Sequence, residues 1–175
     1  LCIAHRDCAS GQHEDTRAAA ANATHDRTCM PCEPGRFSAS KNTKPTCDAC
    51  ADGMYQPAMS SSSCAPKTVC FPGLYVHNNG STTTDRSCNA CIAGWYSDTH
   101  NAASCTPCST TTFQRENESR ACLDHTNCQP GEYEAVLGTP TSDRQCEKCA
   151  AGMYSNSVNA RACTACVQPD RYQPS

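Results

Sequence analysis

The residues with the widest choice of chemistry in this chain are its cysteines, which number 18 among 175 residues. Many stand in Cys-x2-Cys pairs, and Cys29/Cys32 followed by Cys47/Cys50 has the spacing of a zinc ribbon. Such a pair can also be a redox motif, and cysteines at this density are typical of a disulfide scaffold. The cysteines could therefore bind zinc, carry out redox catalysis or form disulfide cross-links.

Several features favour disulfides. The Cys-x5-Cys pairs, such as Cys64/Cys70, have no role in a four-ligand zinc site. A redox pair needs a βαβ setting, which this chain cannot build. Three Asn-x-Ser/Thr sequons, at Asn22, Asn79 and Asn117, indicate the secretory route, N-glycosylation and an oxidising compartment.

No other group of residues suggests catalysis. The histidines form no visible constellation, and the glycines are spaced singly, so no phosphate-binding loop is present. We therefore expect no enzyme activity, no cofactor and no catalytic or metal-binding residue. The six histidines are His5, His13, His25, His77, His100 and His125.

The cysteines define an internal repeat. The spacing from Cys64 to Cys108 is reproduced without change from Cys122 to Cys166, 58 residues later, and a slightly longer version runs from Cys2 to Cys50. The sequence thus predicts three six-cysteine repeats, at residues 1–63, 64–121 and 122–175, with the last loop open.

Two short phrases recur within the repeats. A Cys-x-x-Gly-x-aromatic phrase, as in Cys70…Gly73-Leu74-Tyr75, indicates a turn with positive φ and a ring that covers the adjacent disulfide. An Asp-Arg pair precedes the cysteine that closes each longest loop, and we interpret it as a turn with a local charge pair, the alternative being a binding edge. The three pairs are Asp26-Arg27, Asp85-Arg86 and Asp143-Arg144.

The strands and loops that carry these two sequence phrases must be stable without a large hydrophobic core. Leu, Ile, Val and Phe together number only 14, and helical periodicity is absent. We expect a small disulfide-rich fold: an elongated tandem array of cysteine-rich loops with short β-hairpins, little helix and no large hydrophobic core. A net charge of −3 without a basic stripe argues against nucleic-acid binding, and this window contains no transmembrane segment.

In its cysteine spacing and in these recurring phrases, the chain resembles the tumour-necrosis-factor-receptor-type cysteine-rich domain. Residues 50–88 carry its cysteine frame, a Gly-x-Tyr after Cys50 and a Thr-x-Asp-Arg-x-Cys ending, and residues 108–146 repeat the frame. The motifs also overlap with ephrin-receptor-like cysteine-rich repeats. The sequence departs from the usual pattern in its 58-residue unit and in Ser109-Thr110-Thr111-Thr112-Phe113, which lacks the glycine.

The resemblance implies a disulfide pairing of successive loop ends. An interleaved scheme, with Cys29–Cys47, Cys32–Cys50 and Cys2–Cys8, remains the alternative. The implied pairs are Cys8–Cys29, Cys32–Cys47, Cys50–Cys64, Cys70–Cys88, Cys91–Cys105, Cys108–Cys122, Cys128–Cys146 and Cys149–Cys163.

The sequential pairing leaves Cys2 and Cys166 without partners. We expect these two cysteines to join a continuing tandem chain or a neighbouring subunit in a head-to-tail filament.

Two functions remain for such a chain at the extracellular or cell surface. The sequence favours a structural or adhesive surface component, filament-forming, partnered by copies of itself and carrying glycans. The alternative, implied by the resemblance, is a receptor-type ectodomain that binds a protein ligand. For Trp95 we favour packing on Cys91–Cys105 over a role as contact anchor.

Overall fold

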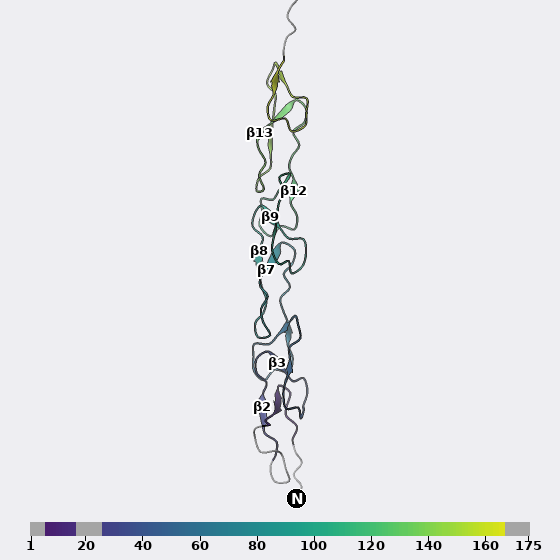
Figure 1. Cartoon of the computed structure of the whole chain (residues 1–175), viewed down its shortest axis with the longest axis vertical. Helices are drawn as coiled ribbons and strands as arrows, with labels where there is room; N and C mark the ends of the chain where they lie inside the picture. Colours follow the sequence, from purple (N-terminus) through teal and green to yellow (C-terminus); the bar gives the residue numbers. More distant parts are fainter. Residues whose placement is uncertain (1–5, 17–25, 167–175) are drawn as a thin grey trace, which may run out of the picture. The chain divides into compact units, whose positions relative to one another are not determined.

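The structure is a computed structural model that describes residues 6–16 and 26–166. Its regular elements are eight antiparallel two-stranded hairpins and, among the described residues, no helix (Figure 1). The pairs are β1 (Gln12–Glu14) with β2 (Cys29–Pro31), β3 (Arg36–Phe37) with β4 (Asp48–Ala49), β5 (Met54–Tyr55) with β6 (Ala65–Pro66), β7 (Leu74–Asn78) with β8 (Ser87–Ala90), β9 (Trp95–Tyr96) with β10 (Thr106–Pro107), β11 (Thr112–Phe113) with β12 (Leu123–Asp124), β13 (Glu132–Val136) with β14 (Gln145–Lys148), and β15 (Met153–Tyr154) with β16 (Thr164–Ala165).

The expected fold class, with short hairpins and no large core, is confirmed. The chain divides into two compact units. The first contains the described residues up to Cys70 together with Val76–Cys88, and the second contains Phe71–Tyr75 and the described residues from Asn89 onward. The buried apolar residues are half-cystines in all cases but one, Phe113, so sulfur takes the place that aliphatic side chains hold in most domains.

Within residues 6–16 and 26–166, eight disulfides close successive loops, and they are the same eight pairs that the resemblance implies. Their Cα–Cα distances run from 5.3 to 5.8 Å, and each joins residues 14 to 21 apart in sequence. Cys166 is an exposed free cysteine, and Cys2 lies outside the described residues.

We expect peptide mapping of the non-reduced protein to recover this pairing. Proteolysis followed by mass spectrometry should yield a Cys8–Cys29 peptide and a Cys32–Cys47 peptide that separate after reduction. A linked peptide joining Cys29 to Cys47 would instead establish the interleaved scheme.

Backbone hydrogen bonds tie each loop to the next one along the chain. The N–H of Gly73 donates to the carbonyl of Ser97 (2.8 Å), and the N–H of Cys91 donates to the carbonyl of Gly73 (2.9 Å). One repeat later, Gly131 and Ser155 (3.0 Å) and Cys149 and Gly131 (2.9 Å) form the same two bonds. Thr111 stands in the glycine position, and its carbonyl still accepts from the N–H of His125 (3.0 Å), so the departure at this site does not remove the hairpin.

A left-handed residue stands four positions before the closing cysteine in each of four loops. These residues are Ser60, Asn101, Glu118 and Asn159, with φ between 55° and 59°. Three of them donate their N–H groups back to cysteine carbonyls: Ser60 to Cys32 (2.9 Å), Glu118 to Cys91 (2.8 Å) and Asn159 to Cys128 (2.9 Å). The loops therefore end in a common turn, which fixes their closing cysteines.

Candidate functional site

The Asp-Arg pairs form a clamp around the residue two positions before a loop-opening cysteine. In the second repeat, Asp85 accepts from the N–H of Thr68 (2.7 Å) and from its hydroxyl (2.6 Å), and Arg86 donates to the carbonyl of Thr68 (3.0 Å). We call each such set, formed by Asp, Arg and their partner residue, an Asp–Arg clamp. Both side chains act inside the fold, which supports the turn interpretation over a binding edge.

The other two repeats contain the same clamp. Asp143 and Arg144 hold Thr126 through contacts of 2.8, 2.6 and 2.8 Å. In the first repeat the partner is Arg6, whose N–H and Nε both donate to Asp26 at 3.0 Å, and Arg27 donates to its carbonyl (3.0 Å).

The hydrogen bonds lower the carboxyl pKa values in these clamps. The pKa of Asp26 is about 2, chiefly because the backbone N–H of Arg6 donates to its charged form. Burial opposes ionisation of Asp143, but the donors of Thr126 and Arg144 outweigh it and bring its pKa to about 2. The pKa of Asp85 is lowered in the same direction, mainly by the Thr68 hydroxyl.

We expect the clamps to make the fold acid-sensitive. A depressed folded-state pKa contributes stability above the ordinary carboxyl value of 3.8, and this contribution is lost as the pH falls toward about 2. Amide exchange at Thr68 and Thr126 should therefore accelerate as the pH falls from 4 to 2, after correction for intrinsic exchange. An Asp85→Asn/Asp143→Asn variant should lose this pH dependence at both amides, and an unchanged profile in the variant would contradict the assignment.

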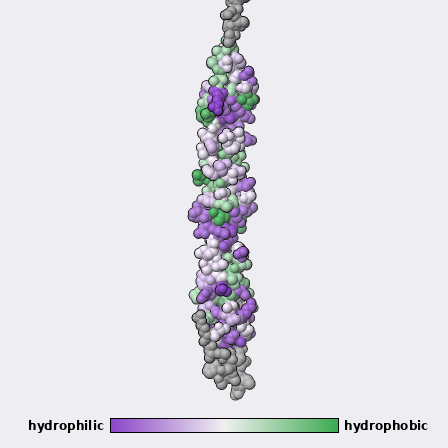
Figure 2. All heavy atoms as spheres, in the orientation of Figure 1, coloured by the Kyte–Doolittle hydropathy of each residue, from purple (hydrophilic) through white to green (hydrophobic). Residues whose placement is uncertain are grey.

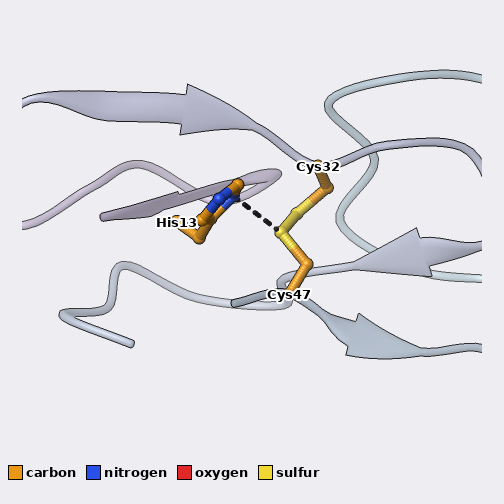
Figure 3. Close-up of side chains that lie close together, drawn as sticks. All are labelled: His13, Cys32 and Cys47. Carbon is orange, nitrogen blue, oxygen red and sulfur yellow. Dashed lines mark hydrogen bonds between the residues drawn. A yellow bond between two sulfur atoms is a disulfide. The ribbon is translucent and has the colours of Figure 1, made fainter. Parts of the chain in front are cut away.

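One histidine lies beside a disulfide in the first repeat (Figure 3). Nδ1 of His13, on β1, is 3.5 Å from Sγ of Cys47, which is bonded to Cys32. In the described part of the chain, only these three residues bring His, Cys, Asp or Glu ligand atoms close enough to hold a metal. The disulfide removes both thiolates that zinc would require, so the arrangement is a histidine packed on a cystine.

A second histidine is part of the packing in the third repeat. The His125 ring is buried, stacks on Phe113 with 5.3 Å between centroids, and has Nδ1 3.3 Å from Oδ1 of Asp143. The guanidinium of Arg115 lies 5.2 Å from the Phe113 centroid. This cluster fills space beside the Asp143 clamp. Sequence reasoning missed it, since Phe113 and His125 come from different loops and meet only in three dimensions. His5, the counterpart of His125 in the first repeat, lies outside the described residues.

Hydrophobic side chains on the face drawn in Figure 2 form small, separate patches among hydrophilic ones. A hollow of about 280 Å³ lies in the second unit and is lined by Tyr75, Ile92, Trp95 and Cys105 among others. Trp95, on β9, is 40% exposed and Ile92 is 64% exposed. Trp95 and Cys105 line the same hollow, and Trp95 also presents apolar surface to solvent. We call this feature the Trp95 hollow.

Two of the three sequons lie among the described residues, and both asparagines are exposed. Oδ1 of Asn79 accepts from Nε of Arg86 (3.1 Å), and Oδ1 of Asn117 accepts from the N–H of Ala93 (2.9 Å). A glycan on the amide nitrogen is compatible with both bonds. Asn22 lies outside the described residues, as do His5 and His25.

Comparison with known proteins identifies the repeated segments. Residues 50–88 and 108–146 match the family model described as TNFR/NGFR cysteine-rich region. Each segment contains two closed loops and one Asp–Arg clamp. No helix among the described residues has the length and apolarity that crossing a membrane requires.

Solved structures include two similar chains. One is in the crystal structure of a mouse RANKL-OPG complex, with 20% identity, coverage of 91% of this chain and 90% of that one, and a TM-score of 0.27. The other is in a human RANKL/OPG complex, with 21% identity, coverage of 91% and 73%, and a TM-score of 0.28. No curated protein matches the chain. Residues 50–88 and 108–146 are therefore tumour-necrosis-factor-receptor-like cysteine-rich repeats.

Proposed function

We propose that this chain is a non-catalytic, extracellular binding module that recognises a protein ligand. The observation that carries the proposal is the pair of TNFR/NGFR cysteine-rich regions, each complete with its two disulfides and its clamp. The sequence alone favours a structural or filament role, and the family matches support the ligand-binding alternative better. Self-association through the free thiol of Cys166 is the competing hypothesis, and the experiment below also detects it.

The Trp95 hollow is the part of the surface that we assign to the ligand. Trp and Tyr are enriched among the residues that dominate binding energy, and a small disulfide-rich chain gains nothing in stability by leaving them exposed. Tyr75, Ile92 and Trp95 come from β7, the turn after Cys91 and β9, and the disulfide at Cys105 holds one wall. An apolar side chain of the ligand would lose part of its hydration when it packs against this hollow.

We also propose N-glycans at Asn22, Asn79 and Asn117. The exposure of Asn79 and Asn117, with only their amide oxygens used in the bonds described above, supports this for two of the sites. The oxidising route that attaches such glycans is the one that forms disulfides.

Substitution of Trp95 should weaken ligand binding strongly. The full chain, immobilised with its disulfides intact, is exposed to a panel of recombinant tumour-necrosis-factor-type ligands in a surface plasmon resonance experiment. For a ligand that binds, Trp95→Ala should lower the affinity by about 30-fold or more, the effect of losing a 2 kcal/mol anchor.

The matched control is Met153→Ala, because Met153 has the same position as Trp95 one repeat later and is 42% exposed. It should leave the affinity within about twofold. Failure of every ligand to bind, together with thiol-dependent polymers on a non-reducing gel, would overturn the proposal in favour of the structural role.

A further inference from the structure

Two of the chain's four methionines meet a histidine in the first unit. Met30, Met59 and His13 all line one hollow of about 440 Å³, which we call the His13 hollow. Met30 is 39% exposed and Met59 is 58% exposed, so the fold does not use either side chain to fill its interior. Two thioethers and an imidazole beside one hollow are a combination that can bind a metal ion.

The three residues are particular to the first repeat. The other repeats have tyrosine at the position of His13, and polar residues without sulfur at the positions of the two methionines. In the cysteine frame, His13 corresponds to Tyr75 and Tyr133, Met30 to Asn89 and Glu147, and Met59 to Asn117.

Three segments bring these side chains together. His13 on β1 is the cross-strand partner of Met30 on β2, and side chains of such partners share a face, with Cβ atoms about 5 Å apart. Met59 comes from a later loop, whose next residue, Ser60, donates its N–H to the carbonyl of Cys32 (2.9 Å). This bond holds the loop of Met59 beside the end of β2.

The His13 ring has one nitrogen that can bind a metal ion. Its Nδ1 lies 3.5 Å from Sγ of Cys47, which is bonded to Cys32 (Figure 3). A disulfide sulfur carries no hydrogen, so Nδ1 is the donor in this contact, and the lone pair of the neutral ring is on Nε2. Metal-binding histidines are oriented in the same manner, by a hydrogen bond from the ring nitrogen that does not bind the metal.

The type of ligand atom, rather than charge, selects the ion. Acidic side chains and the guanidinium of Arg36 both line the hollow. Thioether sulfur is a soft, uncharged ligand that favours Cu(I), whereas Mg²⁺ and Ca²⁺ require oxygen ligands. Zinc sites are built from thiolate, imidazole and carboxylate groups, and the two cysteines beside His13 are held as a disulfide.

We propose that the His13 hollow binds a soft monovalent metal ion of the Cu(I) type through Nε2 of His13 and the sulfur atoms of Met30 and Met59. The β1–β2 hairpin and the disulfide hold the ring in place, while the flexible methionine side chains let both sulfurs close on the ion. The bound ion would join the hairpin to the loop of Met59. This site is independent of the proposed protein ligand.

Ag⁺ is the probe, because it shares the charge and the ligand preference of Cu(I) and keeps one oxidation state. It is added as the nitrate, in chloride-free buffer, to the full oxidised chain labelled with ¹³C at the methionine methyl groups. Free thiols, including that of Cys166, are first blocked with N-ethylmaleimide, since a thiolate would compete for the ion. Ag⁺ should shift the Met30 and Met59 signals in a saturable way, and those of Met54 and Met153, which do not line the hollow, should stay in place. Zn²⁺ should shift none of the four.

Two variants test the assignment of the ligands. Met59→Leu preserves the side-chain volume but removes the sulfur, and it should weaken Ag⁺ binding by about tenfold or more. His13→Tyr introduces the ring that the other repeats carry at this position and should weaken binding at least as much. Met153→Leu, in the second unit, is the matched control and should leave the affinity unchanged. Equal Ag⁺ affinity of Met59→Leu and the parent chain, shifts at all four methionines, or no shift at all would each overturn the inference.

Discussion

Reduction of the eight disulfides is expected to unfold the chain completely rather than loosen it. In the described part of the chain the buried apolar side chains are half-cystines, with Phe113 as the one exception, and Ser38, Ser97 and His125 are the buried polar ones. In the chain-entropy model a disulfide that closes a loop of about 15 residues adds about 3 kcal/mol to the free energy of unfolding. The fold has no large hydrophobic core that could stabilise it once the disulfides are reduced. Two-residue strands cannot persist alone in water.

Amide NMR spectra recorded before and after treatment with a phosphine reductant give the measurement. Dispersed signals should collapse into the narrow range of an unfolded chain. A dispersed spectrum that survives full reduction, verified by alkylation and mass spectrometry, would show that hydrogen bonds and ring packing are sufficient for the fold.

Removal of one disulfide should act locally. The Cys128→Ala/Cys146→Ala variant should lose exchange protection in the β13–β14 hairpin, which that disulfide spans, and keep it in β1–β2, which belongs to the other unit. Loss of protection in both hairpins would show a cooperativity that these contacts do not predict.

Alanine at Gly73 is expected to damage the fold far more than alanine at Gly131, although the two glycines occupy the same position in successive repeats. Both have positive φ, 96° and 90°, so both variants incur the left-handed strain of about 1–2 kcal/mol. At Gly73 an added Cβ would overlap the backbone carbonyl of Glu118, while nothing lies within 4 Å of a Cβ at Gly131. The backbone at Glu118 must move, which typically adds about 1–3 kcal/mol.

Amide exchange at Cys91 and Cys149 measures this difference, because these N–H groups donate to the carbonyls of Gly73 and Gly131. Gly73→Ala should accelerate exchange at Cys91 several-fold more than Gly131→Ala accelerates exchange at Cys149. Equal effects would mean that the strain alone decides the outcome and that the Glu118 turn adapts at no cost.

Much of this fold follows from spacing. The Cys-x-x-Gly-x-aromatic phrase predicts a turn and then a strand, and β7, β9 and β15 begin directly after Gly73, Gly94 and Gly152. Those glycines have positive φ, as the turn requires. The low count of aliphatic residues likewise predicts a fold without a large core.

Other features depend on contacts between distant positions, which no local pattern encodes. Asp85 is 17 residues from Thr68, so the Asp-Arg phrase is visible in the sequence while its partner is not. The left-handed turn falls on Ser60 and Glu118, which are not residues that usually adopt it, and the neighbouring loop imposes it through the bonds to Cys32 and Cys91. The Trp95 hollow is formed by side chains from several loops and could be located only in three dimensions.

The sequential order of the disulfides has a mechanical consequence. If the two ends of the chain were pulled apart, tension would cross each loop through its sulfur bridge and would bypass the residues inside it. Only the short connections between one closing cysteine and the next opening cysteine, such as Cys88 to Cys91 and Cys122 to Cys128, would be stretched. Trp95 lies inside the Cys91–Cys105 loop, so tension along the chain would leave the loop that carries this side chain unstretched.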